Sequence, residues 1–200
     1  MPSPVEFYFD FSSPYGYLAA HRIDDIAARH GRTVNWRPIL LGAVFKTTGQ
    51  QPLTAIPLKG AYSKHDLYRS ARLHGIPFEI PSRFPLATTG ACRVFYHVSD
   101  RVPALARQLA LAICQGYFSG DRDISNPDVV ADIAVNLGVD RDGLNCALND
   151  PALKDRLRSE VESAMARGVF GSPYVIVDDE AFWGADRLDH VERWLATGGW

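Results

Sequence analysis

Two Ser-Pro pairs, far apart in this chain of 200 residues, are the first candidates for chemistry. Ser13-Pro14 follows the alternating segment VEFYFDF, and Ser172-Pro173 begins the apolar segment SPYVIVDD. A serine before a helix commonly accepts a hydrogen bond from the first turn, and proline is favoured at the first helical position. A serine hydroxyl also donates to anions, and the first turn of a helix attracts negative charge. Ser13 is therefore either a helix cap or a residue that stabilises an anionic ligand.

Three features favour a ligand at Ser13. The serine follows a predicted strand, and α/β sheets bind ligands at the carboxyl ends of their strands. Gly16 stands where a capping box has Glu or Gln, and a glycine there allows close approach to the backbone. Pro173 at the start of a buried strand predicts a cis peptide bond beside the site. The segment SSPYG lacks the G-x-S-x-G pattern of a hydrolase, so Ser13 is not interpreted as a nucleophile.

The segments around the two serines predict two structural units. Residues 5–11 alternate with a period of two, which is typical of a strand, and residues 14–30 have a helical period. Residues 33–40 are β-branched and aromatic, so the first unit is β-α-β with parallel strands. The second unit is β-β-α and comprises a strand, its hairpin partner and an amphipathic helix, at residues 172–179, 180–183 and 185–196.

Residues 42–168 separate these two units. Residues 42–60 are rich in Gly, Pro and Thr, which predicts a long loop, and prolines exclude a helix at residues 76–85. The predicted fold is an α/β domain of residues 1–41 and 169–200, interrupted by a helical insertion with its entry loop at residues 42–168. Helices are predicted in the insertion at residues 62–74, 90–98, 103–118, 127–137, 142–148 and 151–167.

The composition, with 46% hydrophobic and 22% charged residues, is that of a soluble globular protein. A formal net charge of −2 gives no electrostatic basis for binding nucleic acid or an anionic membrane. No apolar run approaches the ~20 residues of a membrane span, and no signal peptide is evident, so we expect a cytoplasmic protein. Its cysteines are expected to be reduced and mostly buried. The six histidines are scattered, so we expect no metal site.

Three motifs along the chain resemble those of a known family. FDFSSPYGYLA, GVFGSPYVIV and FWGADRLDHVE occur in this order, and the chain resembles the 2-hydroxychromene-2-carboxylate isomerases, relatives of the kappa-class glutathione transferases. The resemblance extends over nearly the whole chain, including VFKTTGQQPL. It implies a DsbA-like thioredoxin fold, in which an all-helical insertion interrupts the thioredoxin-like domain, and a homodimer. Redox members of that fold have CxxC at the position of Ser13–Gly16; because no cysteine occurs here, dithiol exchange is ruled out.

The resemblance implies that glutathione binds at the two Ser-Pro pairs. Ser13 would hydrogen-bond the thiol sulfur of glutathione as the catalytic residue. Ser172, followed by Pro173, would hold the cysteinyl part of glutathione through backbone hydrogen bonds, a small version of strand addition. Apart from the resemblance, the aromatic residues Tyr8, Tyr15 and Tyr17 could help to line a pocket for an aromatic substrate.

The resemblance also implies contacts with the two ends of glutathione. Ala185, Asp186 and Arg187 would lie near the γ-glutamyl end, where the Asp186 carboxylate could pair with the ligand's ammonium group. Asp186 could instead only cap the last helix. Gln50 stands where many relatives have Asn, so a polar contact of different geometry is expected there. The candidates for a carboxylate of glutathione or of the substrate are Lys46 and Lys59.

The implied reaction converts 2-hydroxychromene-2-carboxylate into trans-o-hydroxybenzylidenepyruvate in aromatic catabolism. The glutathione thiolate would add reversibly to the conjugated system, so that a double bond becomes a rotatable single bond. Two alternatives remain open. A kappa-like glutathione transferase or peroxidase would use the same thiolate on other electrophiles, and a non-catalytic thioredoxin-like module would bind peptides or partner proteins beside the cis-proline.

Overall fold

Four strands form one mixed sheet in the order β2-β1-β3-β4. In the computed structural model, which describes residues 3–200, β1 (Val5–Phe9) pairs in parallel with β2 (Val34–Pro38). On its other side β1 pairs antiparallel with β3 (Tyr174–Val177), which forms a hairpin with β4 (Glu180–Trp183). The predicted β-α-β unit and hairpin are therefore confirmed, and β1 lies between strands from distant parts of the chain.

The single helix predicted at residues 14–30 is two short helices in the structure. α1 (Pro14–Ala20) and α2 (Ile23–Arg29) each have seven residues. The Arg22 N–H donates to the Ala19 carbonyl, three residues back, which is the tighter 3-10 hydrogen-bond pattern. The α-helical pattern is interrupted there, and α2 begins at the next residue. The helix that follows Ser13 is therefore shorter than the sequence period indicates.

The loop predicted at residues 42–60 is also wrong in part, because α3 (Leu41–Thr48) and the 3-10 turn η1 (Leu53–Ala55) lie within it. Leu41, whose N–H donates to the Asp10 carboxylate at 2.7 Å, begins α3. Gly49, with φ of +71°, ends it in the left-handed conformation that glycine favours. The glycines and threonines of this segment disfavour a helix in a reading of the sequence, yet the segment forms a helix of about two turns.

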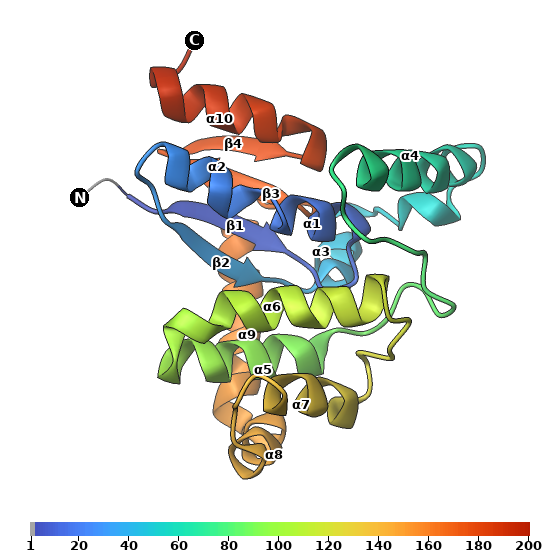
Figure 1. Ribbon diagram of the computed structural model, residues 1–200, viewed down its shortest axis with the longest axis vertical. Coiled ribbons are helices and arrows are strands. Elements are labelled where there is room, and N and C mark those ends of the chain that lie inside the picture. Colours follow the sequence, from blue (N-terminus) through green and yellow to red (C-terminus); the bar gives the residue numbers. More distant parts are fainter. Residues whose placement is uncertain (1–2) are drawn as a thin grey trace.

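The other helices pack around the sheet (Figure 1). They are α4 (Lys59–Leu73), α5 (Thr89–Arg101), α6 (Pro103–Phe118), α7 (Pro127–Val135), α8 (Arg141–Asn149), α9 (Pro151–Ala166), the 3-10 turn η2 (Ala185–Arg187) and α10 (Leu188–Thr197). α2 and α10 pack against each other beside the sheet, α5 and α6 lie below β2 in this view, and α4 projects at one edge (Figure 1). α9 covers the face of the sheet that carries Tyr8 and Arg37, because Glu160 of α9 pairs with Arg37. The predicted helices of the insertion are present. Whether residues 42–168 are a domain of their own stays a prediction.

Aromatic side chains join the sheet to the insertion. The rings of Phe9 and Phe95, from β1 and α5, meet edge to face with their centroids 6.3 Å apart. Phe11 contacts Phe95 in the same way at 6.4 Å, and Trp36 of β2 meets Phe9 at 5.4 Å. Tyr8, on the opposite side of β1, is buried as well. Both faces of β1 are therefore covered, as expected for a central strand with helices on either side.

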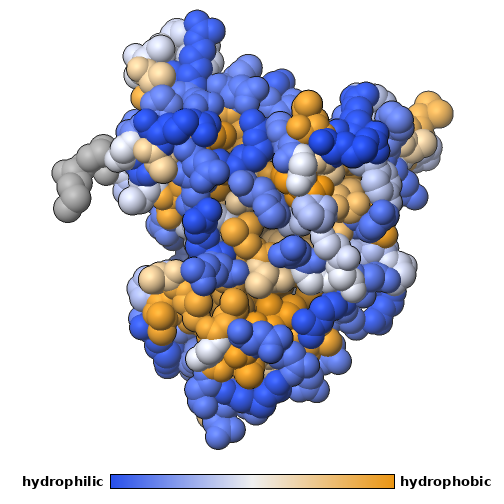
Figure 2. Space-filling model, in the orientation of Figure 1, coloured by the Kyte–Doolittle hydropathy of each residue, from blue (hydrophilic) through white to orange (hydrophobic). Residues whose placement is uncertain are grey.

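The surface is mostly polar on the face shown in Figure 2, apart from an apolar area over α6 and α7. Between residues 3 and 200, no helix has the length and apolar character needed to cross a bilayer.

We expect Phe95→Ala to lower the free energy of unfolding by about 3–5 kcal/mol, because it removes a buried ring that packs on Phe9 of β1 and on Phe11 just after it. Tyr96→Phe, one residue along, removes only the hydroxyl bond to the Pro38 carbonyl and should cost about 1 kcal/mol. Urea denaturation of both variants measures the difference. Equal costs would mean that the Phe95 cluster does not anchor the insertion.

Candidate active site

The two serines meet where β1 ends and β3 begins. The Ser13 hydroxyl donates to the Ser172 carbonyl at 3.0 Å, since a carbonyl oxygen can only accept. The same hydroxyl oxygen accepts from the Gly16 N–H at 3.1 Å and so caps α1. Ser13 is 5% exposed, and the Ser172–Pro173 peptide bond is cis, as the sequence predicts. Ser13 is therefore a helix cap that also contacts the segment preceding the cis-proline.

Gly16 lets the two serine segments approach each other. A Cβ atom at position 16 would lie 2.7 Å from the Ser172 Oγ and 3.1 Å from the Ser13 Cβ. The Ser172 Oγ accepts from the Asp10 N–H at 3.0 Å, so it is held in this position. The close approach that the sequence predicts at Gly16 is thus made by a side chain of the protein itself.

Asp10 is a buried carboxylate that sequence reasoning missed. It is 4% exposed and accepts from the Ser12 N–H at 2.7 Å, the Leu41 N–H at 2.7 Å and the Thr88 hydroxyl at 3.1 Å. Burial raises the pKa of Asp10 above its ordinary value, although these hydrogen bonds act in the opposite direction. The sequence did contain a signal, because Asp10 comes at the end of a predicted central strand, and both faces of such a strand are covered.

Tyr15 faces α4 rather than Ser13. Its hydroxyl donates to the Asp66 carboxylate at 2.8 Å, and Asp66 also accepts from Arg69 at 2.7 Å. Burial raises the pKa of Tyr15, and its hydrogen bond to Asp66 raises it further. Tyr15 therefore remains a neutral hydrogen-bond donor at neutral pH.

The residues predicted for the γ-glutamyl end lie in η2, which packs against α1. Ala185 is partly buried, whereas the Asp186 side chain is 75% exposed and accepts from Arg187 at 3.1 Å. Within the described chain, neither η2 nor α10 has a side-chain cap. Capping by Asp186 is therefore wrong as an explanation of this residue, and its carboxylate faces solvent next to α1.

The three candidates from the entry segment are exposed. Lys46 lies in the last turn of α3, Gln50 follows Gly49, and Lys59 is the first residue of α4. Across residues 3–200, none of the three forms an ion pair or a side-chain hydrogen bond. α3 begins beside Asp10 and α4 packs against α1, so both elements border the site. Contact of these three side chains with a ligand stays a prediction.

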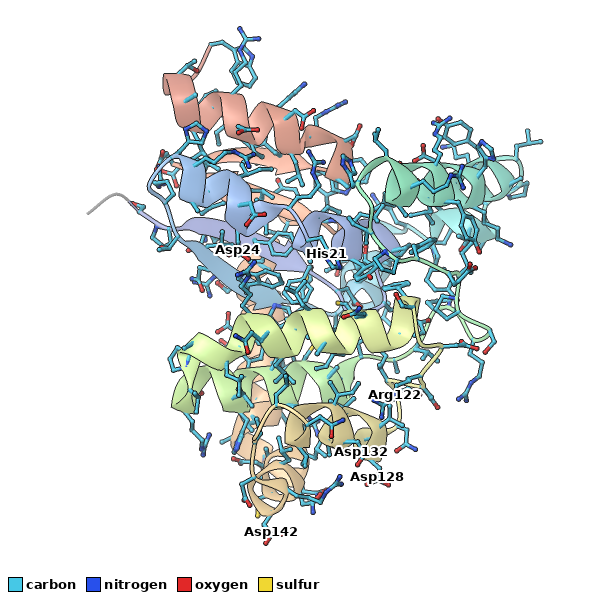
Figure 3. All side chains as sticks on the ribbon, in the orientation of Figure 1. His21, Asp24, Arg122, Asp128, Asp132 and Asp142 are labelled. Carbon is cyan, nitrogen blue, oxygen red and sulfur yellow. The ribbon has the colours of Figure 1, made fainter. Side chains whose placement is uncertain are left out.

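The cysteines differ in their burial. Cys92 and Cys114 are buried, and burial raises the pKa of both thiols, which keeps them protonated. Cys146 of α8 is exposed, so the prediction of buried cysteines holds for two of the three. Among residues 3–200 no group of three or more His, Cys, Asp or Glu side chains is placed to hold a metal ion. The labelled Asp128, Asp132 and Asp142 lie on the outer helices in Figure 3.

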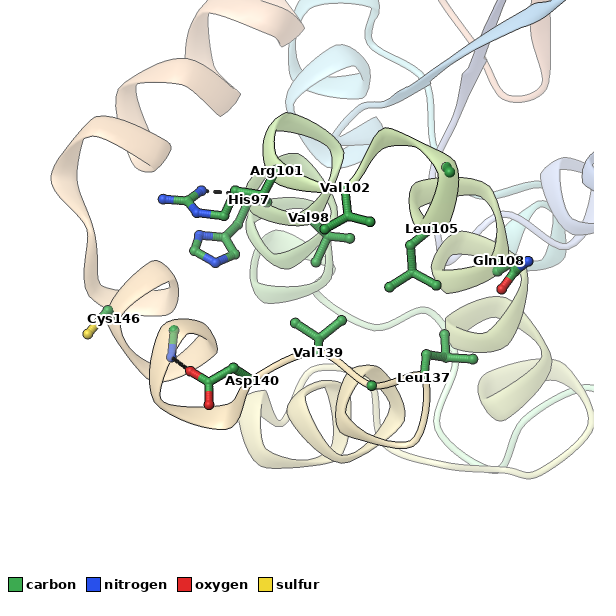
Figure 4. A pocket seen from close by; sticks show the side chains of 13 residues that line it. His97, Val98, Arg101, Val102, Leu105, Gln108, Leu137, Val139, Asp140 and Cys146 are labelled. Carbon is green, nitrogen blue, oxygen red and sulfur yellow. Dashed lines mark hydrogen bonds between the residues drawn. The ribbon is translucent and has the colours of Figure 1, made fainter.

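A groove of about 810 Å³ lies in the helical layer, where α5 ends and α6 begins, opposite the connection from α7 to α8 (Figure 4). Its walls include Val98, Leu105 and Val139, with His97 and Asp140 at the polar side. No predicted site residue lines this groove. The groove is therefore separate from the candidate site around Ser13, which is defined by its hydrogen bonds.

Comparisons with known proteins cover the whole site. The family model of the DSBA-like thioredoxin domain matches residues 4–196. A 2-hydroxychromene-2-carboxylate isomerase of Pseudomonas putida is 31% identical over 190 residues, which cover 94% of this chain and 92% of that protein. Glutathione S-transferase kappa 2 of Caenorhabditis elegans is 27% identical over 205 residues, which cover 96% of this chain and 91% of that protein.

A solved structure has the same fold over nearly its full length. It is that of a 2-hydroxychromene-2-carboxylate isomerase, and it matches this chain with a TM-score of 0.87 and 29% sequence identity. The match covers 96% of this chain and 94% of that one. The similarity therefore includes the sheet as well as the helices of the insertion.

We expect Gly16→Ala to lower the free energy of unfolding by about 1 kcal/mol. The new Cβ would displace the Ser172 Oγ and leave the Asp10 N–H without its acceptor, at a cost of about 1–3 kcal/mol. The helix preference of alanine offsets about 0.5–1 kcal/mol of this. Gly42→Ala in α3 is the control, because the Cβ would meet open space, and it should be stabilising. A stabilising Gly16→Ala, measured by thermal and urea denaturation, would contradict the close contact.

Proposed function

Because the chain belongs to the family of DSBA-like thioredoxin domains, and because its relatives include isomerases and kappa-class glutathione transferases, we propose that it is a glutathione-dependent isomerase. The proposed substrate is 2-hydroxychromene-2-carboxylate and the product is trans-o-hydroxybenzylidenepyruvate. The observation that carries the proposal is the Ser13 hydroxyl, held 3.0 Å from the Ser172 carbonyl at the end of β1, where no cysteine is present. This arrangement suits thiol binding and excludes dithiol exchange.

The residues present fit glutathione. When bound, glutathione would supply a thiolate that adds to and leaves the conjugated system, which allows rotation about the former double bond. A free thiol has a pKa near ~8.5, so it is mostly protonated at neutral pH unless its anion is stabilised. The Ser13 hydroxyl, at the start of α1, can donate to such an anion.

The Ser13 hydroxyl has one hydrogen, and in this structure the Ser172 carbonyl receives it. To stabilise a thiolate, the hydroxyl must turn this hydrogen toward the sulfur. The Ser172 carbonyl then needs another donor, because an unpaired buried acceptor costs about 1–3 kcal/mol. The amide N–H of the cysteinyl part of glutathione would supply it by adding to the start of β3 as an extra strand. Binding of the peptide portion would thus free the hydroxyl for the sulfur.

The first turn of α1 contributes less than a long helix would. Pro14 has no N–H, and the Gly16 N–H is already bonded to Ser13, so among the described residues Tyr15 has the remaining first-turn donor. Because α1 has seven residues, the positive charge at its N-terminus is limited. Stabilisation of the thiolate would therefore depend mainly on the hydroxyl of Ser13.

Residues of several neighbouring elements would complete the binding of glutathione and substrate. Asp186 would accept from the γ-glutamyl ammonium group, and Arg187, which already contacts Asp186, would keep that carboxylate oriented. Tyr15 would stay protonated and line the substrate pocket next to α4. The remaining contacts would come from Gln50, Ala185, the Ser172–Pro173 backbone, and one or both of Lys46 and Lys59.

A second candidate function is that of a kappa-like glutathione transferase. The 27% identity to a kappa-class transferase over most of both chains favours it, and the same Ser13 would activate the same thiol. The two functions differ in the electrophile that the thiolate attacks. We propose a homodimer for either function, with no nucleic acid or membrane as partner.

Turnover of the chromene carboxylate with and without glutathione tests the function. We expect turnover only with glutathione, and we expect Ser13→Ala to reduce it by about one to three orders of magnitude, the usual effect of losing a preorganised donor. The pKa of bound glutathione, followed by thiolate absorbance, should rise in the variant. Stability should fall by about 1–4 kcal/mol, because the variant loses the cap of α1 and also leaves the Ser172 carbonyl without its donor.

Asn126→Ala is the matched control for Ser13→Ala. Asn126 caps α7 through a bond from the Asp128 N–H, far from the site, so this variant should lose about 1 kcal/mol, the part of the loss that comes from a cap, and keep full turnover. Unchanged turnover and unchanged thiolate titration in a folded Ser13→Ala protein would make Ser13 a cap and refute the mechanism. Glutathione-dependent conjugation without isomerisation would favour the transferase.

We expect Asp186→Ala to weaken glutathione binding by about ten- to a hundredfold, the effect of losing one charge-assisted hydrogen bond. Stability without ligand should change by less than about 0.5 kcal/mol, because Asp186 is exposed and caps no helix. The measurement is the rise in melting temperature with glutathione, which corresponds to about 1.4 kcal/mol at ten times the Kd in the wild-type protein. Asp189→Ala, an exposed aspartate of α10, is the control and should leave the Kd unaltered.

A further inference from the structure

Every polar atom of Asp10 is engaged in a hydrogen bond. Its backbone carbonyl accepts from the Ser13 N–H at 2.9 Å, and its N–H donates to the Ser172 Oγ at 3.0 Å. One carboxylate oxygen accepts from the Ser12 N–H and the Thr88 hydroxyl. The other carboxylate oxygen accepts from the Leu41 N–H at 2.7 Å. A single residue thus contacts four segments of the chain.

These segments are the ones that form the proposed site. The backbone of Asp10 fixes Ser13 and Ser172, whereas its side chain fixes the turn at Ser12 and the first residue of α3. α3 leads to Lys46 and Gln50, and Thr88 directly precedes α5. We call α3 and the residues after it up to Gln50 the α3 arm, because this segment carries two of the predicted glutathione-binding residues. The carboxylate of Asp10 therefore connects the α3 arm to the turn that holds the proposed catalytic hydroxyl of Ser13.

Burying a carboxylate at this position has a cost in stability that its hydrogen bonds must offset. Because burial raises the pKa of Asp10, the folded protein holds the ionised form less favourably than the unfolded chain does. At any pH above both pKa values, ionised Asp10 therefore favours folding less than protonated Asp10 would, and this difference decreases as the pH falls below the folded-state pKa. The geometry, with three donors and no acceptor around the carboxylate, suits the ionised form.

We propose that Asp10 is a positioning residue that sets the start of α3 relative to the Ser13 turn, so that glutathione meets the α3 arm and the hydroxyl together. The proposal rests on the proposed function, because it concerns how the same site is assembled. Asp10 would touch neither glutathione nor substrate. Its side chain acts in two separable ways, through Leu41 on the arm and through Ser12 on the turn.

Asp10→Asn and Asp10→Ala separate these two actions. Asparagine can keep its oxygen on Ser12 and Thr88, but its NH₂ group would then face the Leu41 N–H, so that only the α3 bond is lost. We expect the KM for glutathione to rise about tenfold, with kcat within about twofold of the wild type. Alanine also releases the turn at Ser12, so kcat should fall by about ten- to a hundredfold as well. Hydrogen exchange of the Leu41 amide should be faster in both variants.

Asp24→Asn is the matched control. Asp24, labelled in Figure 3, is a partly buried aspartate of α2 that accepts from the Trp36 indole of β2 and pairs with Arg107 of α6. This variant should lose stability but keep KM, kcat and the exchange rate of the Leu41 amide.

The results distinguish the proposals from each other. If the wild-type protein does not bind glutathione, the proposed function is wrong, and the proposed role of Asp10 in glutathione binding is wrong with it. If the wild type responds to glutathione but both Asp10 variants keep its KM and kcat, Asp10 is structural and the function stands. An Asn variant that loses kcat while keeping KM would also overturn the assignment. If the Ala variant does not fold, the KM and the Leu41 exchange rate of the Asn variant still decide.

Discussion

The hydrogen bond from Ser13 to the Ser172 carbonyl joins two parts of the chain that are 159 residues apart. It requires β1 and β3 to be neighbours, which places the end of one beside the start of the other. It also requires a glycine at position 16, because any larger residue would reach the Ser172 Oγ. Sheet order and the local glycine thus both serve one contact, and the proposed chemistry begins with breaking it.

The site depends on hydrogen bonds to the backbone more than on charged side chains. Ser13 bonds to a carbonyl and an N–H, and Asp10 bonds mainly to backbone amides. Backbone groups are fixed by the strands and helices that contain them, so they need little reorganisation when charge develops nearby. The exposed Asp186 and Lys46, in contrast, remain free to adjust to a ligand. The buried part of the site would therefore fix the sulfur, and the exposed part would bind the ends of the ligand.

Sequence reasoning predicted the strands, the two Ser-Pro pairs and the cis-proline, because alternation, caps and proline act locally. It failed where tertiary contacts decide the outcome. α3 begins at Leu41 because a carboxylate from another segment accepts its N–H, and no local pattern contains that information. Likewise, the residues at positions 14–30 have one continuous helical period, yet the chain starts a new helix after Arg22. Asp10 was overlooked because its partners are brought together only by the fold.

The sheet order also has a consequence for how the protein folds during synthesis. β1 and β2 can pair early, since α1 and α2 are the only helices between them, but β3 is made after the whole helical layer. Until then the open edge of β1 exposes unpaired backbone groups, which can pair with other chains. Closing such a long loop before its contacts form slows folding of the last strand. The nascent chain therefore acquires its Ser13 site only in the final stage of folding, and an incomplete chain that lacks β3 carries the serine without the site.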